Sequence, residues 1–281
     1  MLKKNMVSKP ARTLLYMILG IVAVFQVYPI LWVIISSLKD RQELISSASY
    51  ALPRSLYFGN YQYALMTSSI PKAFVNSIIV AVATLGLEVT IACPFAFALS
   101  KLRFKAGPKL FAVILTGMMI PTFVCLIPMF RMYNTLGLRN TYFSLVLPQL
   151  GFGLPMSIYM YNSFMEYVPN SLLEAAQIDG ATAWQSFVRI VVPMVKNAPV
   201  TIITYKFIYV WNEFTYANTF MTDKNMKTLP IMLKDFAGEY GMVEWGPTYA
   251  AITLAILPTL ILYFLLNKNI IEGMALGAVK M

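Results

Sequence analysis

The sequence contains no histidine and few charged residues. Histidine is absent from all 281 positions, and Asp, Glu, Lys and Arg together make up 12% of the chain. Soluble domains carry about 25% charged residues, so this composition, with 58% hydrophobic residues and a mean hydropathy of +0.65, indicates a membrane protein. Without histidine, catalysis by a histidine acid or base and histidine ligation of a metal are excluded.

Cysteine and the common catalytic motifs are also scarce. The two cysteines, Cys93 and Cys125, each lie within an apolar run and without CxxC spacing, so we interpret them as buried packing residues. The chain has no GxxxxGK[ST] phosphate loop and no GxSxG, HExxH, DFG or DDxxD element. We therefore expect a protein that is not an enzyme, with no catalytic residue, no metal site and no cofactor of its own.

The charge that is present is mainly positive, with a net charge of +10. The basic residues lie between apolar runs and make no continuous stripe with aromatic residues, so nucleic acid is not the expected partner. A basic excess in such a chain fits contact with the anionic surface of a lipid bilayer.

Six apolar runs are long enough to cross a bilayer, which takes about 20 residues. Together they predict an all-α polytopic membrane protein with a single transmembrane domain over 1–281. The first run is too long for a signal peptide and is expected to be retained. The predicted spans are 13–38, 73–100, 110–130, 140–165, 197–222 and 245–267. Pro121 and Pro128 are expected to kink the third span.

The distribution of basic residues favours cytoplasmic positions for both termini. Four basic residues precede the first span, and four more crowd the short link between the second and third spans. In this orientation the segment 170–196 is cytoplasmic, and the loops 39–72 and 223–244 are external. The expected location is the cell membrane, crossed several times.

The segment 170–196, between the fourth and fifth spans, is polar and has clear helix boundaries. Ser171 with Glu174, and Thr182 with Gln185, match the S/T-x-x-E/Q pattern of a capping box. Gly180 lies between them, where a left-handed residue would end the first helix. The pattern predicts a helix from Leu172 to about Ile178, a glycine turn and a second helix over about 183–192. On these signals alone, the segment could be a simple link between two spans or a rigid functional element.

The same segment resembles the EAA motif of the membrane subunits of ABC importers, EAA-x3-G-x9-I-x-L-P. The matching positions, with valine at 192 in place of leucine, are Glu174, Ala175, Ala176, Gly180, Ile190 and Pro193. The resemblance extends to FVNSIIVA at 74–81, VWNEF at 210–214, TLPIML at 228–233 and EGMALGAVKM at 272–281. These segments are similar to the carbohydrate-uptake branch, the MalG-like permeases, and identify 73–267 as the permease core.

The resemblance implies a type I ABC importer fold and a mechanism. The segment 170–196 would be a coupling loop that docks on an ATPase subunit, with Glu174, Ala175, Ala176, Asp179 and Gly180 at the contact. The implied partners are a second permease subunit of a different sequence, two ATPase subunits that hold ATP and Mg, and an extracytoplasmic solute-binding protein. This chain would form half of a sugar pore.

Charged residues within spans are costly and usually face a cavity or a partner. Glu88 lies in the second span, and Lys206 and Glu213 lie in the fifth. One hypothesis is that these residues, with Trp211 and Asn212, line the path of the sugar. The alternative, which we favour for Glu88 and Lys206, is an ion pair between helices that fixes their packing.

Other transporter classes remain as alternatives. The same ABC importer architecture could carry a cargo other than a sugar. A secondary transporter that works without ATP would commonly show an internal repeat, and no clear repeat relates the two halves of this chain.

Overall fold

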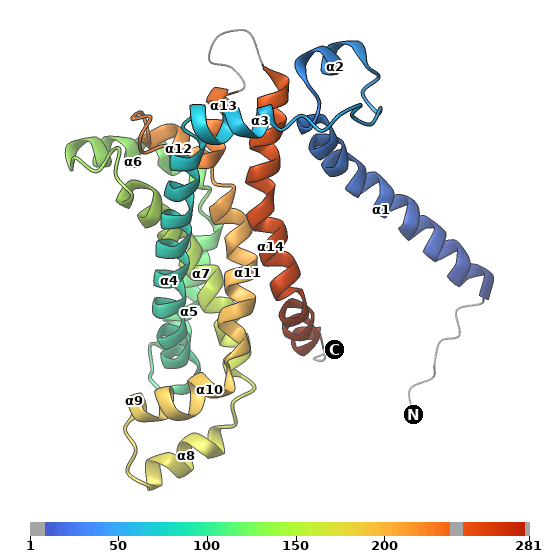
Figure 1. Ribbon diagram of the computed structural model, residues 1–281. Helices are drawn as coiled ribbons and strands as arrows, with labels where there is room; N and C mark the ends of the chain where they lie inside the picture. The colour runs from blue at the N-terminus through green and yellow to red at the C-terminus, as the bar shows by residue number, and fades with distance from the viewer. Residues whose placement is uncertain (1–8, 237–243, 279–281) are drawn as a thin grey trace. The chain divides into compact units, whose positions relative to one another are not determined.

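Figure 1 shows a computed structural model that describes residues 9–236 and 244–278, and all of its described secondary structure is helical. The first half of the chain forms α1 (Lys9–Ser37), α2 (Arg41–Ser46), α3 (Gly59–Gln62), the π-helix η1 (Tyr63–Thr67), α4 (Ile70–Lys101), α5 (Gly107–Thr116), the 3-10 helix η2 (Gly117–Met119) and α6 (Thr122–Thr135). The second half forms α7 (Phe143–Met165), α8 (Asn170–Ile178), α9 (Ala183–Ser186), the π-helix η3 (Phe187–Val191), α10 (Val192–Met194), α11 (Asn197–Trp211), α12 (Thr215–Phe220), α13 (Leu229–Phe236) and α14 (Trp245–Ala278).

Four described helices are long and apolar enough to cross a bilayer. They are Pro10–Ser37, Ile70–Lys101, Phe143–Met165 and Trp245–Leu266, which agree with the first, second, fourth and sixth predicted spans. Two bent helix pairs raise the number to six if each pair is one span. Part of the predicted loop 223–244 (237–243) and the end of the segment 272–281 (279–281) lie outside the described residues, as do the side chains of 272–278.

The third predicted span, 110–130, is not one continuous helix, because it turns sharply at Pro121, one of the two prolines expected to kink it. Gly107–Met119 and Thr122–Thr135 meet at an angle of 91°. The backbone is extended at Ile120 (ψ 114°) and Pro121 (ψ 121°). Proline has no amide hydrogen and disfavours the helical conformation in the residue before it, so the chain turns here instead of bending gently.

The fifth predicted span, 197–222, is also interrupted, since α11 ends at Trp211. The carboxylate of Glu213 accepts the amide of Tyr216 (2.7 Å) through Oε1 and the amide of Ala217 (3.1 Å) through Oε2. In a continuous helix these amides would bond to carbonyls four residues earlier. The side chain of Glu213 therefore takes their place and begins the separate short helix α12.

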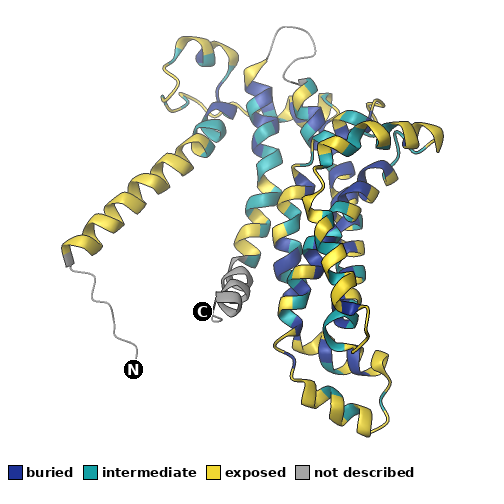
Figure 2. Ribbon diagram, turned by 180° about the vertical axis from the view of Figure 1, so that it is seen from behind, coloured by how far each residue is buried: buried dark blue, intermediate teal, exposed yellow. Residues whose placement is uncertain are grey.

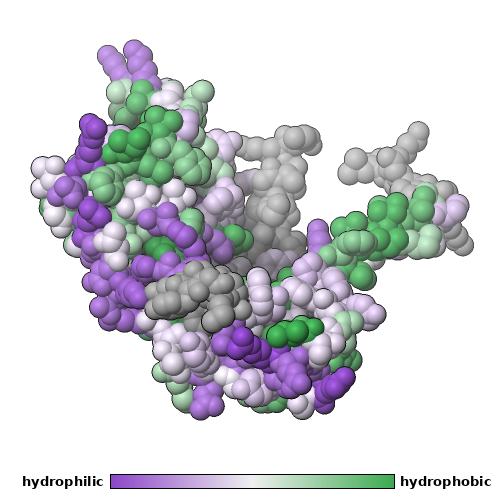
Figure 3. All heavy atoms as spheres, turned by 90° about the horizontal axis from the view of Figure 1, so that it is seen from above, coloured by the Kyte–Doolittle hydropathy of each residue, from purple (hydrophilic) through white to green (hydrophobic). Residues whose placement is uncertain are grey.

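The chain divides into two compact units. The first combines Met1–Ser68 with Leu233–Ala255, and the second combines Ser69–Met232 with Ile256–Met281. In the first unit, the buried amide of Asn60 donates to the carbonyls of Ser37 and Lys39 at 2.8 Å each, which closes the end of α1. Residues 10–29 of α1 are exposed (Figure 2), and their side chains are mostly apolar (Figure 3).

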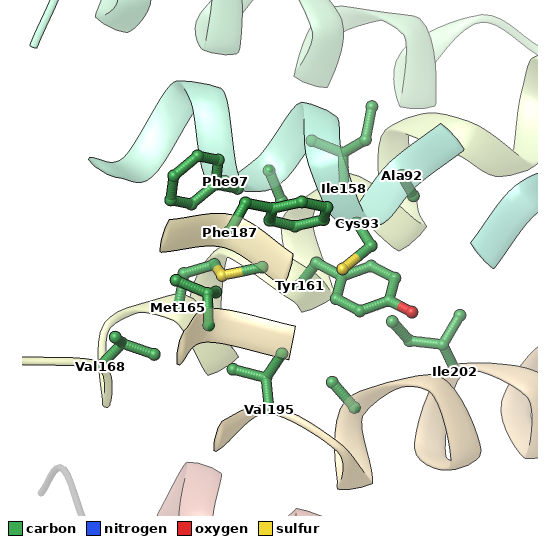
Figure 4. Close-up of a cluster of buried hydrophobic side chains, with 13 residues drawn as sticks. Ala92, Cys93, Phe97, Ile158, Tyr161, Met165, Val168, Phe187, Val195 and Ile202 are labelled. Atoms are coloured by element: carbon green, nitrogen blue, oxygen red, sulfur yellow. The ribbon is translucent and has the colours of Figure 1, made fainter. Parts of the chain in front are cut away.

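The second unit is built on α4, α7 and α11, which pack along one another and contribute to two apolar clusters. One cluster joins these three helices to η3 (Figure 4) and contains Ala92, Cys93, Ala96, Phe97, Ile158, Tyr161, Met165, Val168, Phe187, Val191, Val195, Ala198 and Ile202. The other adds side chains of α6 and α12. Cys93 is a buried packing residue, as predicted, whereas Cys125 is only half-buried.

Asparagine side chains fix the loop after α12 to this bundle. Asn76, at 3% exposure, donates to the carbonyls of Asn225 and Lys227 at 2.9 Å each and accepts the hydroxyl of Tyr142 at 2.8 Å. Asn140, in a left-handed conformation (φ 56°), accepts the amide of Thr222 at 2.7 Å. Asp223 also forms a local turn, since its Oδ1 accepts the amide of Asn225 at 2.8 Å, but the attachment of the loop to the bundle depends on side chains from distant parts of the sequence.

We expect Asn76→Leu to release this loop. The substitution removes three hydrogen bonds and leaves two carbonyls without their donor, at a cost of about 1–3 kcal/mol for each buried group that stays unsatisfied. Thermal unfolding of the purified protein should begin at a lower temperature, and hydrogen exchange should rise over 222–229. The control is Asn134→Ala, which removes one exposed hydrogen bond to Arg139. Equal unfolding temperatures and equal hydrogen exchange over 222–229 in the two variants would contradict a structural role for Asn76.

Candidate functional site

The segment between α7 and α11 folds as a helical hairpin at the lower end of the second unit (Figure 1). Gly180 has a φ of +80°, and two hydrogen bonds close the end of α8 around it: Ala181 N to Ala176 O (2.8 Å) and Gly180 N to Gln177 O (3.1 Å). This pair of bonds is the glycine-centred C-cap expected for a helix that stops sharply. The predicted helix, glycine turn and helix are confirmed.

The two predicted capping boxes have different outcomes. The second is present: Thr182 Oγ1 accepts the amide of Gln185 (3.2 Å), and Gln185 Oε1 accepts the amide of Thr182 (2.8 Å). The first was wrong, because α8 begins at Asn170 with Pro169 at its N-cap and no side-chain cap. Proline at 169 already holds the extended conformation that precedes a helix, so α8 starts before Ser171 could cap it.

Glu174, the acidic residue of the first predicted box, instead forms an ion pair with a distant residue. Glu174 Oε1 lies 3.3 Å from Arg103 Nη2, in an ion pair whose side chains are 60% and 85% exposed. An exposed pair of this kind contributes little to stability, about 0–1 kcal/mol. Glu174 is therefore available at the surface for a stronger partner.

The other residues of the predicted contact form an accessible surface around the glycine turn. Ala175 and Asp179 are exposed, Ala176 is half-buried, and Gly180 is exposed. Ile178, beside them, is 86% exposed although it is a large apolar residue. A single exposed apolar side chain is common on protein surfaces, so accessibility, and not hydrophobicity, is what this surface offers to a partner.

The second arm of the hairpin packs against the bundle along one face, while Trp184 and Val188 on its other face are exposed. Phe187, Val191 and Val195 are 0–5% exposed and belong to the cluster with α4, α7 and α11 (Figure 4). At the base of the first arm, Lys101 Nζ donates to Val168 O (2.7 Å) and Asn170 Oδ1 (3.0 Å). The hairpin thus has an exposed first arm and a second arm that is continuous with the core.

The three central helices also share a buried ion pair. Lys206 Nζ of α11 lies 3.2 Å from Glu88 Oε1 of α4, and Ser157 Oγ of α7 donates to the same oxygen at 2.6 Å. Glu88 is fully buried, and the side chain of Lys206 is 12% exposed. The ion pair favoured from the sequence is therefore present.

Lys206 also borders a cleft of about 460 Å³ on the side of α7 and α11. The cleft lies where α5 gives way to α6 and where α11 ends, so both helix breaks contribute to its wall. Its lining residues are Met118, Thr122, Gln149, Phe152, Gly153, Met156, Tyr205, Lys206, Tyr209, Val210, Glu213, Thr215 and Tyr216.

The five residues proposed for a cargo path separate into four groups. Lys206 and Glu213 line the cleft, and Glu88 lies buried behind Lys206. Trp211 is 4% exposed and packs edge-on against Phe74 at 5.5 Å, so it is a core residue and not part of this wall. Asn212 is exposed and donates to Ile208 O at 2.8 Å, outside the cleft lining.

The sequence interpretation missed the aromatic and amide side chains of the cleft. Tyr205 and Tyr209 follow the same helical face as Lys206 and Glu213, a spacing of three and four residues that would have identified them. Gln149 is 8% exposed, in a run that is otherwise apolar, and this isolated amide was the other available signal.

Comparisons with known proteins agree along most of the chain. A family model described as "Binding-protein-dependent transport system inner membrane component" matches residues 89–275. A Caldicellulosiruptor protein named as an ABC transporter permease is 34% identical over 252 residues, which cover 90% of this chain and 91% of that protein. The diacetylchitobiose uptake system permease protein of Streptomyces coelicolor is 30% identical over 259 residues, 92% of this chain and 85% of that protein.

The fold also has a counterpart among solved structures. A chain in the crystal structure of a bacterial ABC transporter involved in the import of the acidic polysaccharide alginate has a TM-score of 0.81 to this chain. The two are 23% identical, and the match covers 94% of this chain and 99% of that chain. At this identity the likeness establishes the fold.

We expect Lys206→Met to destabilise the protein more than the double variant Glu88→Gln/Lys206→Met. The single change leaves a buried carboxylate without its cation, at a cost of about 3–5 kcal/mol, whereas removing both charges is often close to neutral. The measurement is the unfolding temperature of the detergent-purified chain for both single variants and the double variant. Additive shifts would show that the two side chains do not stabilise each other.

Gly153 offers a second test of the same packing. A Cβ at this position would meet Glu88 Oε1 and Lys206 Nζ at 2.6 Å each, whereas a Cβ at Gly151, two residues earlier, meets nothing within 4 Å. Gly153→Val should therefore lower stability by about 1–3 kcal/mol through overpacking. Gly151→Val is the matched control, and the yield of monodisperse protein with its unfolding temperature is the readout. A loss of stability in Gly151→Val as large as that in Gly153→Val would contradict the prediction.

Proposed function

This chain belongs to the family of binding-protein-dependent transport system inner membrane components, and we propose that it is a permease subunit of an ATP-driven sugar importer. In this proposal it forms half of a translocation pore and couples to a separate ATPase through the α8–α10 hairpin. The observation that carries the coupling role is the hairpin itself, exposed on its first arm and packed into the core along one face of its second arm.

The chain is a multi-pass inner-membrane protein with the all-α fold of a type I importer permease, as the sequence predicted. Permease subunits of such importers lack their own ATPase site. Consistent with this, the sequence has no phosphate loop. We propose that ATP and Mg are held by two partner ATPase subunits, which supply the energy.

Coupling requires a rigid element that transmits motion. Glu174, Ala175, Ala176, Asp179 and Gly180 would form the contact with the ATPase, supported by the exposed Ile178 at the same tip. Because Phe187 and Val191 are part of the core, displacement of the tip would move α4, α7 and α11 with it. A hairpin that was only a surface loop would absorb the motion.

The orientation follows from the basic residues. We propose that both termini and the hairpin lie in the cytoplasm, and that the loops 39–72 and 223–244 lie outside. The external side would receive cargo from a solute-binding protein, a role supported by the description of the family. A second permease of different sequence would complete the pore.

A sugar cargo is supported by two observations of sequence similarity. The segments 210–214 and 272–281 resemble the carbohydrate branch, and a relative at 30% identity is named as a permease for diacetylchitobiose uptake.

The experiment that tests coupling measures how much ATPase co-purifies with the tagged permease. It compares wild type with variants in which the charges of Glu174 and Arg103 are changed. In Glu174→Arg, recovery of the ATPase with the tagged permease should fall by tenfold or more, because truncating or reversing one charge of a docked pair costs about 2–5 kcal/mol. The double variant Arg103→Glu/Glu174→Arg restores the internal ion pair but not a contact with the ATPase, so recovery should stay low.

Arg103→Ala is the matched control, since it removes the internal pair and keeps Glu174. Its ATPase recovery should stay within about fivefold of wild type, because an exposed pair is worth at most about 1 kcal/mol. Full recovery in the double variant would mean that the internal pair matters and that Glu174 does not contact the ATPase. Wild-type recovery in Glu174→Arg would also overturn the coupling role.

A further inference from the structure

We infer that the cleft beside Lys206 is a saccharide subsite of this chain, and that it accepts uncharged, hydroxyl-rich cargo and disfavours anionic cargo. The inference rests on the proposed function and goes beyond it, because it assigns a binding site to this subunit and a charge class to its cargo. The likeness to an alginate transporter chain does not decide the charge, since it establishes the fold alone.

The first step is the balance of charge in the cleft. Two charged side chains line it, Lys206 and Glu213, and a third, Glu88, lies directly behind Lys206. The ammonium is already 3.2 Å from the carboxylate of Glu88, so it is neutralised before any ligand arrives. One cation against two carboxylates leaves an excess of one negative charge, which repels a carboxylate, sulfonate or phosphate on a cargo.

The second step is that the remaining carboxylate is held in place by the backbone. Glu213 accepts the amides of Tyr216 and Ala217 at 2.7 and 3.1 Å, and these bonds stabilise it as an acceptor without a counter-cation. Its remaining lone pairs can accept hydroxyl hydrogens. An acceptor of this kind suits a sugar hydroxyl and not an anion.

The third step is an amide that lacks a partner. Gln149 lines the cleft at 8% exposure, and its Nε2 donates to Leu145 O at 3.0 Å. Its Oε1 is buried and has no hydrogen-bond partner within residues 9–236 and 244–278. Buried polar atoms are rarely left in this state, and a rotation of the side chain toward the cleft would let a ligand hydroxyl satisfy it.

The fourth step is the aromatic wall. Tyr205 and Tyr209 lie one helical turn apart on α11 with their rings 5.1 Å apart, and Phe152 and Tyr216 line the cleft from α7 and α12. Aromatic rings offer flat apolar surface to the C–H faces of a sugar, while planar amide and carboxylate groups take its hydroxyls. The cleft combines both kinds of group within about 460 Å³, the size of a site for a small ligand.

The test is uptake by cells that lack this chain and are complemented with wild type or variants. The probes are isotope-labelled neutral oligosaccharides (raffinose, maltotriose, diacetylchitobiose) and acidic ones (a galacturonate trimer and an alginate trimer). Wild type should restore uptake of at least one neutral probe and of no acidic probe. For the restored cargo, Gln149→Leu and Tyr209→Leu should each raise the KM by about tenfold, as expected for a lost hydrogen bond or ring contact.

Tyr159→Leu is the matched control, because Tyr159 is an exposed tyrosine of α7 outside the cleft lining, and its KM should stay within twofold. Amounts of each variant in the membrane and ATPase recovery with it are measured in parallel. Restored uptake of an acidic probe, or an unchanged KM in both cleft variants, would overturn this inference and leave the importer role intact. If wild type restores none of the five probes, this inference and the sugar cargo of the proposed function fail together.

Discussion

The second unit depends on one buried contact, the ion pair of Glu88 and Lys206. A fully buried carboxylate is tolerated only with a close cation and further hydrogen bonds. Here Lys206 and Ser157 supply them to Oε1 from two other helices, while the buried Oε2 has no hydrogen-bond partner within the described residues. This requirement allows little freedom in the relative positions of α4, α7 and α11. The small size of Gly153, next to both charged atoms, is a consequence of the same close approach.

The pair also connects the two candidate sites. On the side of the cleft, it fixes Lys206 in the wall and cancels its charge. Toward the hairpin, α4 continues from Glu88 through Cys93 and Phe97 into the cluster that holds the second arm (Figure 4). Cleft and hairpin are thus parts of one packed body, so a displacement at one end is felt at the other without a flexible joint between them.

The sequence predicted the features that depend on local chemistry. Three such features are determined by neighbouring residues, and the structure contains all of them: the left-handed Gly180, the capping box of Thr182 with Gln185, and four long apolar helices. Two features that it did not predict are also local, but there neighbouring residues carry competing signals. The break after Trp211 depends on the carboxylate of Glu213, which accepts the amide of Tyr216 three residues further along. The start of α8 depends on Pro169 more than on Ser171.

The failures lie mainly where the cleft is. A hydropathy pattern identifies a span by its apolar length, and it treats a polar residue within the span as a defect. Here Glu213 and Pro121 interrupt two predicted spans, and the interruptions leave backbone and polar side chains at the wall of a cavity. Irregular backbone at membrane depth is stable only where protein or a hydrated cavity can satisfy it. The helix breaks and the cleft therefore depend on each other. Without the cavity, the unpaired backbone groups of the broken helices would cost too much free energy. Without the breaks, the bundle would have no polar wall to offer a cargo.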